Sequence, residues 1–174
     1  MTNAMESKAG EQTPDTGQGV VTRTVNAPAE AVWGVLADGW MYGMWVVGAS
    51  RIREVEPSWP QQGSRIHHSV GLWPLLIDDH TEVLSATAGR ELLLKARGWP
   101  AGEAQVRLTI EPARSQHSTI RIAEDVTAGP GLLVPRPARQ QVIKARNIET
   151  LRRLAFIAEG RYRESVNAGR TSEL

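Results

Sequence analysis

One histidine and one aspartate are spaced to meet across a hairpin. The segments that hold His68 and Asp79 flank Trp73–Pro74, a dipeptide typical of a turn between strands. If Leu72 faces Leu75 across that turn, His68 faces Asp79 on the inward side of the hairpin. A histidine oriented by a carboxylate is a general base, so this pair is a candidate catalytic pair. A structural hydrogen bond between two buried polar groups would give the same pattern, and both interpretations stay open.

Charged residues support this register. It places Arg65 opposite Glu82 on the outward side, where opposite charges on neighbouring strands attract each other. It also pairs His67 with His80 on that face. Two histidines without a third ligand make a weak metal site, so we expect no metal there. The sequence has no phosphate-binding glycine loop, nucleophile elbow or dinucleotide fingerprint, and we expect no cofactor.

Glu124 is the second candidate for chemistry. It shares the alternation of Ile120, Ile122 and Val126, so we expect it on the buried face of its strand. A carboxylate in that position would bind a ligand hydroxyl or move a proton. A local bulge, or pairing with an arginine of the last helix, would explain the position equally well.

Asn147 is the third candidate, because it interrupts an apolar helical stripe between Ile143 and Leu151. Its amide would donate to a ligand carbonyl, and it would serve equally well as a cap or as the partner of a buried water. Aromatic side chains are expected to form other parts of the interior wall. They are Trp33, which we assign mainly to the core, and Trp40, Trp45 and Trp73.

A sheet is needed to position these residues. Between Ala49 and Val126 apolar residues recur at every second position, and short turns rich in Gly, Pro and Ser separate the runs. Such alternation is typical of antiparallel strands with one buried face and one wet face. A further short run at 20–25 adds a strand at the start of the chain.

Helices are expected before and after these strands. The first, 28–37, begins near Asn26 and Pro28, and Gly34 within it indicates close packing against a neighbour. Residues 40–47 form a short second helix or a wall segment. The last helix, at about 138–163, would lie across the concave sheet. Its apolar stripe consists of Val142, Ile143, Ile148, Leu151, Leu154, Ala155 and Ala158.

The two ends of the chain differ from its middle in composition. Residues 1–19 are rich in Gly, Thr, Gln, Glu and Asp and lack an apolar period, which predicts a disordered tail. Residues 164–174 are predicted to be a flexible tail. A single domain is therefore expected over 20–163.

The composition of the 174-residue chain argues against several classes of function. A net charge of +1 and the lack of a Lys/Arg run argue against nucleic-acid binding. The absence of cysteine excludes disulfides, thiolate nucleophiles and cysteine-bound metals. No apolar stretch approaches the roughly 20 residues of a membrane span, so we expect no stable membrane insertion and a cytoplasmic location.

The order of these elements resembles the START-like (SRPBCC, helix-grip) superfamily, and within it the polyketide cyclase/dehydrase-like family. The resemblance implies an α+β helix-grip fold, in which a curved antiparallel sheet of about seven strands wraps around a long C-terminal helix. Two short helices would follow the first strand. The likeness extends over about 20–160, and besides the last helix it is carried by Ala27–Trp33, Asp38–Trp45, Gly63–Arg65 and Thr81–Val83.

The resemblance also implies a mostly apolar cavity between the sheet and the long helix. We expect a monomer or homodimer that binds a hydrophobic or amphipathic small molecule, either a lipid or a polyketide-like compound. The apolar loop 131–135 would gate the cavity or tuck onto the core. Besides His68 and Asp79, the expected site residues are Trp40, Trp45, Val70, Trp73, Leu94, Val106, Leu108, Ile122, Glu124, Ile143, Asn147 and Leu151.

Two other functions stay open. The first is a cyclase-type enzyme, which would close and dehydrate a polyketide with His68 and Asp79 as its base. A pocket also accelerates such a reaction by positioning the chain. The second is a protein-interaction module that docks through loop 131–135.

Overall fold

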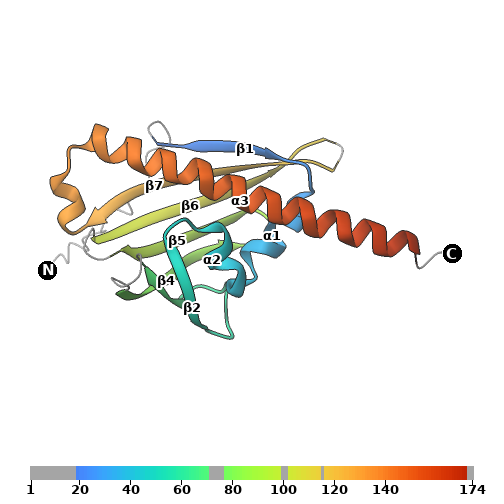
Figure 1. Cartoon of the computed structure of the whole chain (residues 1–174), viewed down its shortest axis with the longest axis horizontal. Helices are drawn as coiled ribbons and strands as arrows, with labels where there is room; N and C mark the ends of the chain where they lie inside the picture. The colour runs from blue at the N-terminus through green and yellow to red at the C-terminus, as the bar shows by residue number, and fades with distance from the viewer. Residues whose placement is uncertain (1–18, 71–76, 99–101, 115, 172–174) are drawn as a thin grey trace, which may run out of the picture.

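The computed structural model describes residues 19–70, 77–98, 102–114 and 116–171, and its strands form one antiparallel sheet (Figure 1). The seven strands lie in the order β1-β7-β6-β5-β4-β3-β2, so the expected helix-grip sheet is confirmed. Their bounds are Val21–Val25 (β1), Ala49–Val55 (β2), Arg65–Val70 (β3), Ile77–Thr87 (β4), Glu91–Gly98 (β5), Gly102–Pro112 (β6) and Ser118–Ala128 (β7).

The hairpin of β3 and β4 has the expected register. Arg65 pairs with Glu82, and His68 pairs with Asp79. The guanidinium of Arg65 donates to the Glu82 carboxylate at 3.1 Å, which is the cross-strand charge pair that favoured this register. The turn residues Trp73–Pro74 lie outside the described residues.

Two short helices follow β1, and one long helix ends the fold. They are α1 (Ala29–Leu36), α2 (Tyr42–Trp45) and α3 (Arg136–Thr171), with 3-10 turns at Gly39–Met41 (η1) and Pro130–Leu133 (η2). Figure 1 shows α3 lying along the sheet and continuing past the sheet edge. The helix continues past the expected end at Arg163 to Thr171, and residues 164–171 contain no proline that would interrupt it. Among the described residues, no helix is both long and apolar enough to cross a membrane.

The first helix differs from expectation at two positions. Pro28 occupies the N-cap position, and the side chain of Asn26 donates to the Glu159 carboxylate at 3.1 Å instead of capping the helix. Gly34 is exposed, and no atom lies within 4 Å of the position that a Cβ would take there. The expected close packing at Gly34 is therefore wrong.

The buried face of α3 is more polar than expected. Two residues assigned to its apolar stripe, Val142 and Ile148, are 71% and 48% exposed. The helical period of i, i+3, i+4 and i+7 places Asn147 inward and turns Ile148 outward. The buried residues of α3 are Gln140, Ile143, Asn147, Thr150, Leu151, Leu154, Ala155 and Ala158.

The hydrophobic core joins the sheet to α1 and to the middle of α3. Leu108 and Ile120 of the sheet belong to it, as do Val32 of α1 and Leu154 of α3. The buried polar residues of α3 lie closer to the N-terminus of the helix than the residues that it contributes to this core. The interior beneath the first half of α3 is therefore where a polar site can form.

Candidate functional site

A small cavity of about 100 Å³ lies between the sheet, α2 and the first half of α3. Most of its wall is apolar. Its lining includes several of the residues expected to bind a ligand, namely Trp45, Val70, Leu94, Val106, Ile122, Glu124 and Asn147. We call it the inner cavity.

Three side chains of the inner cavity wall form a row of hydrogen bonds. The hydroxyls of Tyr42 and Thr81 are 2.9 Å apart, and the Thr81 hydroxyl lies 3.0 Å from Nε2 of His68. The strand pairing places Thr81 and His68 on the same inward face, and α2 brings Tyr42 over them. The rings of Tyr42 and His68 stack with centroids 5.4 Å apart, while Trp45 meets Tyr42 edge-on at 5.2 Å.

Burial determines the charge of this row. It raises the pKa of Tyr42 to about 12, because the phenolate would lose its hydration. It also lowers the pKa of His68 below its ordinary value of 6.5, and this effect outweighs the attraction of the Asp79 carboxylate. Both groups are therefore neutral at pH 7. Nδ1 of His68 is buried and has no hydrogen-bond partner among the described residues.

Asp79 lies opposite His68 in the strand register, but it is not the hydrogen-bond partner of the ring. Its Oδ1 accepts the backbone N–H of His80 at 2.8 Å, and its carbonyl accepts from Arg53 at 3.4 Å. The hydroxyl of Thr81 holds the His68 ring instead. The arrangement thus lacks the hydrogen-bonded histidine–carboxylate couple that a general base would use.

Glu124 is buried on β7 and is paired with Arg146 of α3. This agrees with one of the explanations left open by the sequence, an arginine of the last helix. The arginine bonds Oε1 of the carboxylate, while Oε2 is buried without a partner among the described residues. The Arg146 side chain is 41% exposed, so the ion pair reaches from the interior to the surface.

A second cavity of about 330 Å³ adjoins the first and opens beside the start of α3. We call it the outer cavity. Ile143, one of the expected ligand-binding residues, lines it together with Val126, Val134 and Val142. Both cavities have a wall in common, formed by Ala96, Arg97, Glu124 and Arg146. The Glu124–Arg146 pair therefore stands at the boundary between them.

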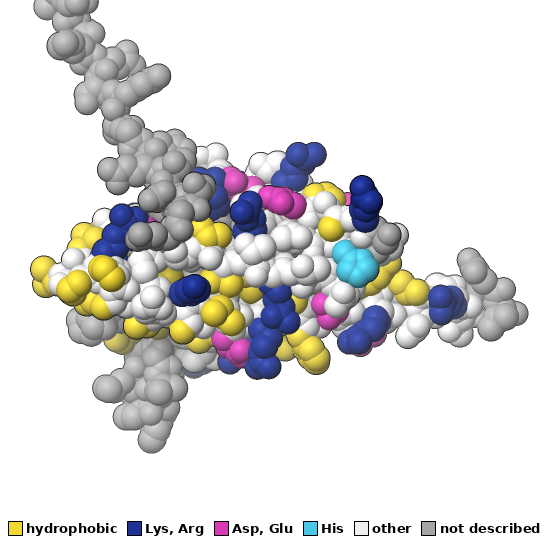
Figure 2. Space-filling model, turned by 90° about the horizontal axis from the view of Figure 1, so that it is seen from above, with side chains coloured by type: hydrophobic (Ala, Val, Ile, Leu, Met, Phe, Trp, Pro, Cys, Tyr) yellow, Lys and Arg dark blue, Asp and Glu magenta, His cyan; other side chains and the backbone are white. Residues whose placement is uncertain are grey.

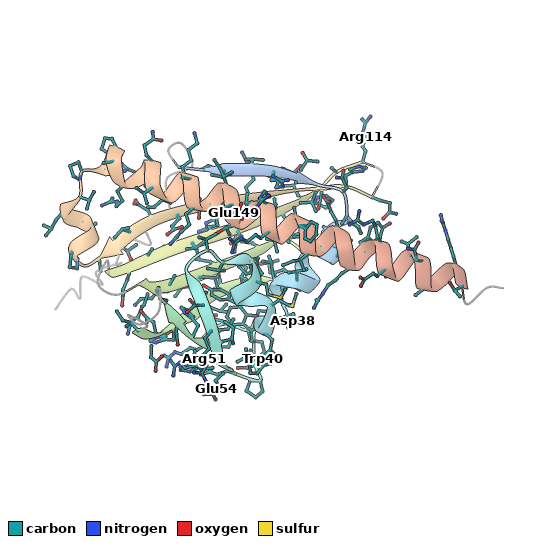
Figure 3. The ribbon with its side chains drawn as sticks, viewed as in Figure 1. Asp38, Trp40, Arg51, Glu54, Arg114 and Glu149 are labelled. Carbon is teal, nitrogen blue, oxygen red and sulfur yellow. The ribbon has the colours of Figure 1, made fainter. Side chains whose placement is uncertain are left out.

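The remaining expected site residues lie elsewhere. Leu108 and Leu151 are fully buried in the core and line neither cavity. Trp40 is 61% exposed and lies at the outer edge of the molecule (Figure 3), so the structure corrects its placement as an interior wall. A 3-10 turn directs successive side chains roughly 120° apart, and η1 therefore turns Trp40 outward beside the buried Gly39. Trp73 lies outside the described residues.

The apolar loop before α3 is not tucked onto the core. Leu133 is 86% exposed, and Leu132 and Val134 are also exposed. Figure 2 shows hydrophobic side chains gathered at this end of the molecule, and Gly131 and Val134 border the outer cavity. The loop thus lies beside the opening of the outer cavity, which is the position expected of a gate, and it is not packed onto the core.

Sequence reasoning missed Tyr42, Thr81 and Arg146 as individual site residues. Thr81 had a usable signal, because the register that placed His68 inward places Thr81 inward too. Tyr42 and Arg146 reach the site only through the packing of α2 and α3. On the outer face, the rings of His67 and His80 lie 6.0 Å apart. In the part of the chain that the structure describes, no three His, Asp or Glu side chains are grouped to hold a metal.

No protein-family model matches the sequence, and no curated protein matches it either. Solved structures do match its fold. An aromatase/cyclase from Streptomyces sp. R1128, named ZhuI, is 22% identical with a TM-score of 0.60, and the match covers 82% of this chain and 93% of that one. A START superfamily protein from Mycobacterium smegmatis is 20% identical with a TM-score of 0.56, and the match covers 83% and 96%.

A third match is DynU16, described as a putative protein in the dynemicin biosynthetic locus. It is 23% identical with a TM-score of 0.56, and the match covers 80% of this chain and 46% of that chain. At such identities the likeness establishes the fold alone. The chain has the helix-grip fold, as the resemblance in sequence implied.

Proposed function

We propose that this helix-grip protein binds an amphipathic small molecule between its sheet and the first half of α3. The observation that carries the proposal is the pair of adjoining cavities, of about 100 and 330 Å³. Small-molecule sites commonly measure roughly 300–1,000 Å³, so the outer cavity alone reaches that range. The inner cavity adds a smaller compartment, whose lining includes the uncharged polar side chains of Thr81, Asn147 and Thr150.

The linings of the cavities indicate the character of the ligand. Val106, Val126 and Ile143 belong to largely apolar walls, and burial of an apolar ligand surface contributes ~25 cal/mol per Å² before ordering costs are subtracted. His68, Thr81 and Asn147 add polar groups on the inner side. A ligand with an apolar body and a polar end matches this arrangement.

Turnover by a cyclase-type mechanism has less support than binding. Such a reaction was expected to use His68 as a base oriented by Asp79. The contacts of Asp79 go to backbone groups and to Arg53, and the ring of His68 is held by Thr81. The likeness to an aromatase/cyclase extends to the fold, which many different functions share.

The experiment uses a neutral fluorescent hydrophobic probe, N-phenyl-1-naphthylamine, with the full-length chain. Ala96 borders both cavities, so Ala96→Leu should fill space between them and lower probe binding severalfold. Ala86→Leu is the matched control, because Ala86 is exposed on β4 and borders neither cavity. Native mass spectrometry of the purified chain, followed by denaturing extraction, would identify any retained molecule.

Two results would argue against the proposal. One is a wild-type chain that binds no probe and retains no molecule. The other is equal probe binding by Ala96→Leu and Ala86→Leu, which would place the bound probe on the surface.

A further inference from the structure

The hydrogen-bonded row in the inner cavity has only one direction that satisfies every buried hydroxyl. The Tyr42 hydroxyl is buried, and its one hydrogen-bond partner among the described residues is Thr81. If Tyr42 donates to Thr81, Thr81 donates its single hydrogen to Nε2 of His68. In the reverse direction, Thr81 would donate to Tyr42, and the Tyr42 hydrogen would have no acceptor there. Within the described residues, the reverse direction leaves two buried groups unpaired, the Tyr42 hydrogen and the Nδ1 lone pair of His68, whereas the first leaves only an N–H at Nδ1. Because each unpaired buried group is costly, the first direction is favoured.

This direction fixes the tautomer of His68. With Nε2 acting as an acceptor, the proton of the neutral ring resides on Nδ1. That N–H is buried and has no partner among the described residues. His68 is therefore a hydrogen-bond donor at Nδ1, and it has no lone pair there to serve as a base.

Two more donors in the same wall have no hydrogen-bond partner in the part of the chain that the structure describes. They are the indole N–H of Trp45 and the side-chain N–H of Asn147, both of which are buried. The rings of Trp45 and His68 both pack on the ring of Tyr42. Asn147 is on the buried face of α3, one turn before Thr150, whose hydroxyl accepts the backbone N–H of Val47 at 3.4 Å. Trp45, His68 and Asn147 all line the inner cavity.

The unpartnered acceptor of this wall is Oε2 of Glu124, which belongs to a carboxylate paired with Arg146. The two arginines of this wall are already matched by carboxylates, Arg146 by Glu124 and Arg97 by Glu103, so neither is an unpaired cation for a charged ligand, while Oε2 can accept a ligand hydroxyl. The polar end of the ligand should therefore accept hydrogen bonds without carrying negative charge. A neutral carbonyl meets both conditions.

We propose that the inner cavity recognises a neutral carbonyl oxygen of the ligand through the N–H groups of Trp45, His68 and Asn147. This rests on the proposed binding function and specifies the ligand class as ketones or aldehydes with an apolar body. Buried donors are normally paired, by protein or by water. A bound carbonyl oxygen would supply the partner that the protein itself does not.

The test compares three small probes with the full-length chain. Acetophenone carries the carbonyl, α-methylstyrene replaces that oxygen with a methylene group of similar shape, and benzoate replaces the ketone with a carboxylate. Titrations are followed by 15N NMR of the indole N–H of Trp45 and the carboxamide of Asn147. We expect acetophenone to bind about tenfold more tightly than α-methylstyrene, which corresponds to one or two net hydrogen bonds. Benzoate should bind more weakly than acetophenone.

Two variants separate a role in binding from a role in folding. Asn147→Leu replaces the carboxamide with an apolar side chain of similar size, and Trp45→Phe removes the indole N–H but keeps an aromatic ring, so each should lower the acetophenone preference severalfold. Asn167→Leu is the control, because Asn167 is exposed on the same helix. The 15N shifts of the His68 ring report its tautomer in the unliganded protein, and Nδ1–H is the expected form.

The results separate the two proposals. Equal binding of acetophenone and α-methylstyrene, or a ring of His68 protonated at Nε2 alone, would overturn carbonyl recognition and leave small-molecule binding standing. Failure of all three probes and of N-phenyl-1-naphthylamine to bind would overturn both proposals.

Discussion

The guanidinium of Arg146 on α3 holds the carboxylate of Glu124 on β7 at the boundary between the two cavities. The two partners differ in environment, because Glu124 is buried and Arg146 is partly exposed. The helix thus supplies the positive charge that pairs with this buried carboxylate. This contact also joins the long helix to the sheet beside the candidate ligand site.

Removal of the arginine should destabilise the fold. Arg146→Met would leave Glu124 buried and unpaired, and we expect the free energy of unfolding to fall by about 1–3 kcal/mol. The loss should be smaller than for a fully buried pair, because Arg146 is partly exposed. Urea unfolding monitored by circular dichroism measures this loss. Arg152→Met is the control, because Arg152 pairs with Glu149 on the exposed side of α3. Equal losses in the two variants would show that the Glu124–Arg146 pair behaves as an ordinary surface pair.

The hydroxyl of Thr81 should matter more to stability than that of Tyr42. Tyr42→Phe removes one hydrogen bond and should cost about 1 kcal/mol. Thr81→Val leaves both Tyr42 and His68 without a partner, and we expect a loss of about 2–3 kcal/mol. Thr22→Val, at an exposed position of β1, controls for the change of side chain. If Thr81→Val lost no more stability than Thr22→Val in thermal or urea unfolding, the row of hydrogen bonds would not contribute to the stability of the fold.

Strand alternation was enough to predict much of the site. It placed His68 and Asp79 opposite each other and turned Glu124 inward, because the period of two is a local property of each strand. The partners of these residues were harder to predict. Tyr42 meets Thr81 across a sequence separation of 39, and Arg146 meets Glu124 across 22. Such contacts depend on how α2 and α3 pack on the sheet.

The phase of the long helix was the other source of error. Apolar character favoured Ile148 as a buried residue, but it is 48% exposed, whereas Asn147 beside it, a candidate site residue from the sequence, is buried. A strictly apolar stripe would have filled that space with carbon. The polar residues buried there, Asn147 and Thr150, mark the candidate site. A prediction from hydrophobicity alone would place both of them on the exposed face of the helix.

His68 should make the fold less stable in mild acid. Because burial lowers its pKa in the folded state, the unfolded chain takes up the proton first as the pH falls below about 6.5. The free energy of unfolding should therefore decrease between about pH 7 and pH 5.5. His68→Asn removes this proton uptake and should flatten the dependence, which urea unfolding at several pH values would measure.

A second histidine provides the comparison for that measurement. Burial also lowers the pKa of His80, on the outer face, so His80→Asn should remove its own share of the pH dependence. His68→Asn combined with His80→Asn should give the flattest profile. An unchanged slope in His68→Asn would mean that the buried ring is not a source of acid sensitivity.

Two glycines near the start of the chain should respond oppositely to the same substitution. Gly34→Ala should stabilise the protein by about 1 kcal/mol, because the site is helical and open. Gly39→Ala should destabilise it, since a Cβ there would lie 2.6 Å from a methyl group of Val55. The melting temperatures of the two variants measure the difference. A drop in melting temperature for Gly34→Ala would mean that the site is less open than described.

The connection between the two ends of the chain has a consequence for synthesis on the ribosome. β1 pairs only with β7 among the described strands, and the backbone N–H of Asn26 donates to Glu159, 133 positions later. Successive hairpins from β2 to β7 can form as the chain emerges. The first strand, in contrast, has to wait unpaired until β7 and the terminal helix are made. Closure of the sheet by β1 therefore waits for the synthesis of β7, and a chain that stopped before β7 would keep β1 unpaired and β6 as an open sheet edge.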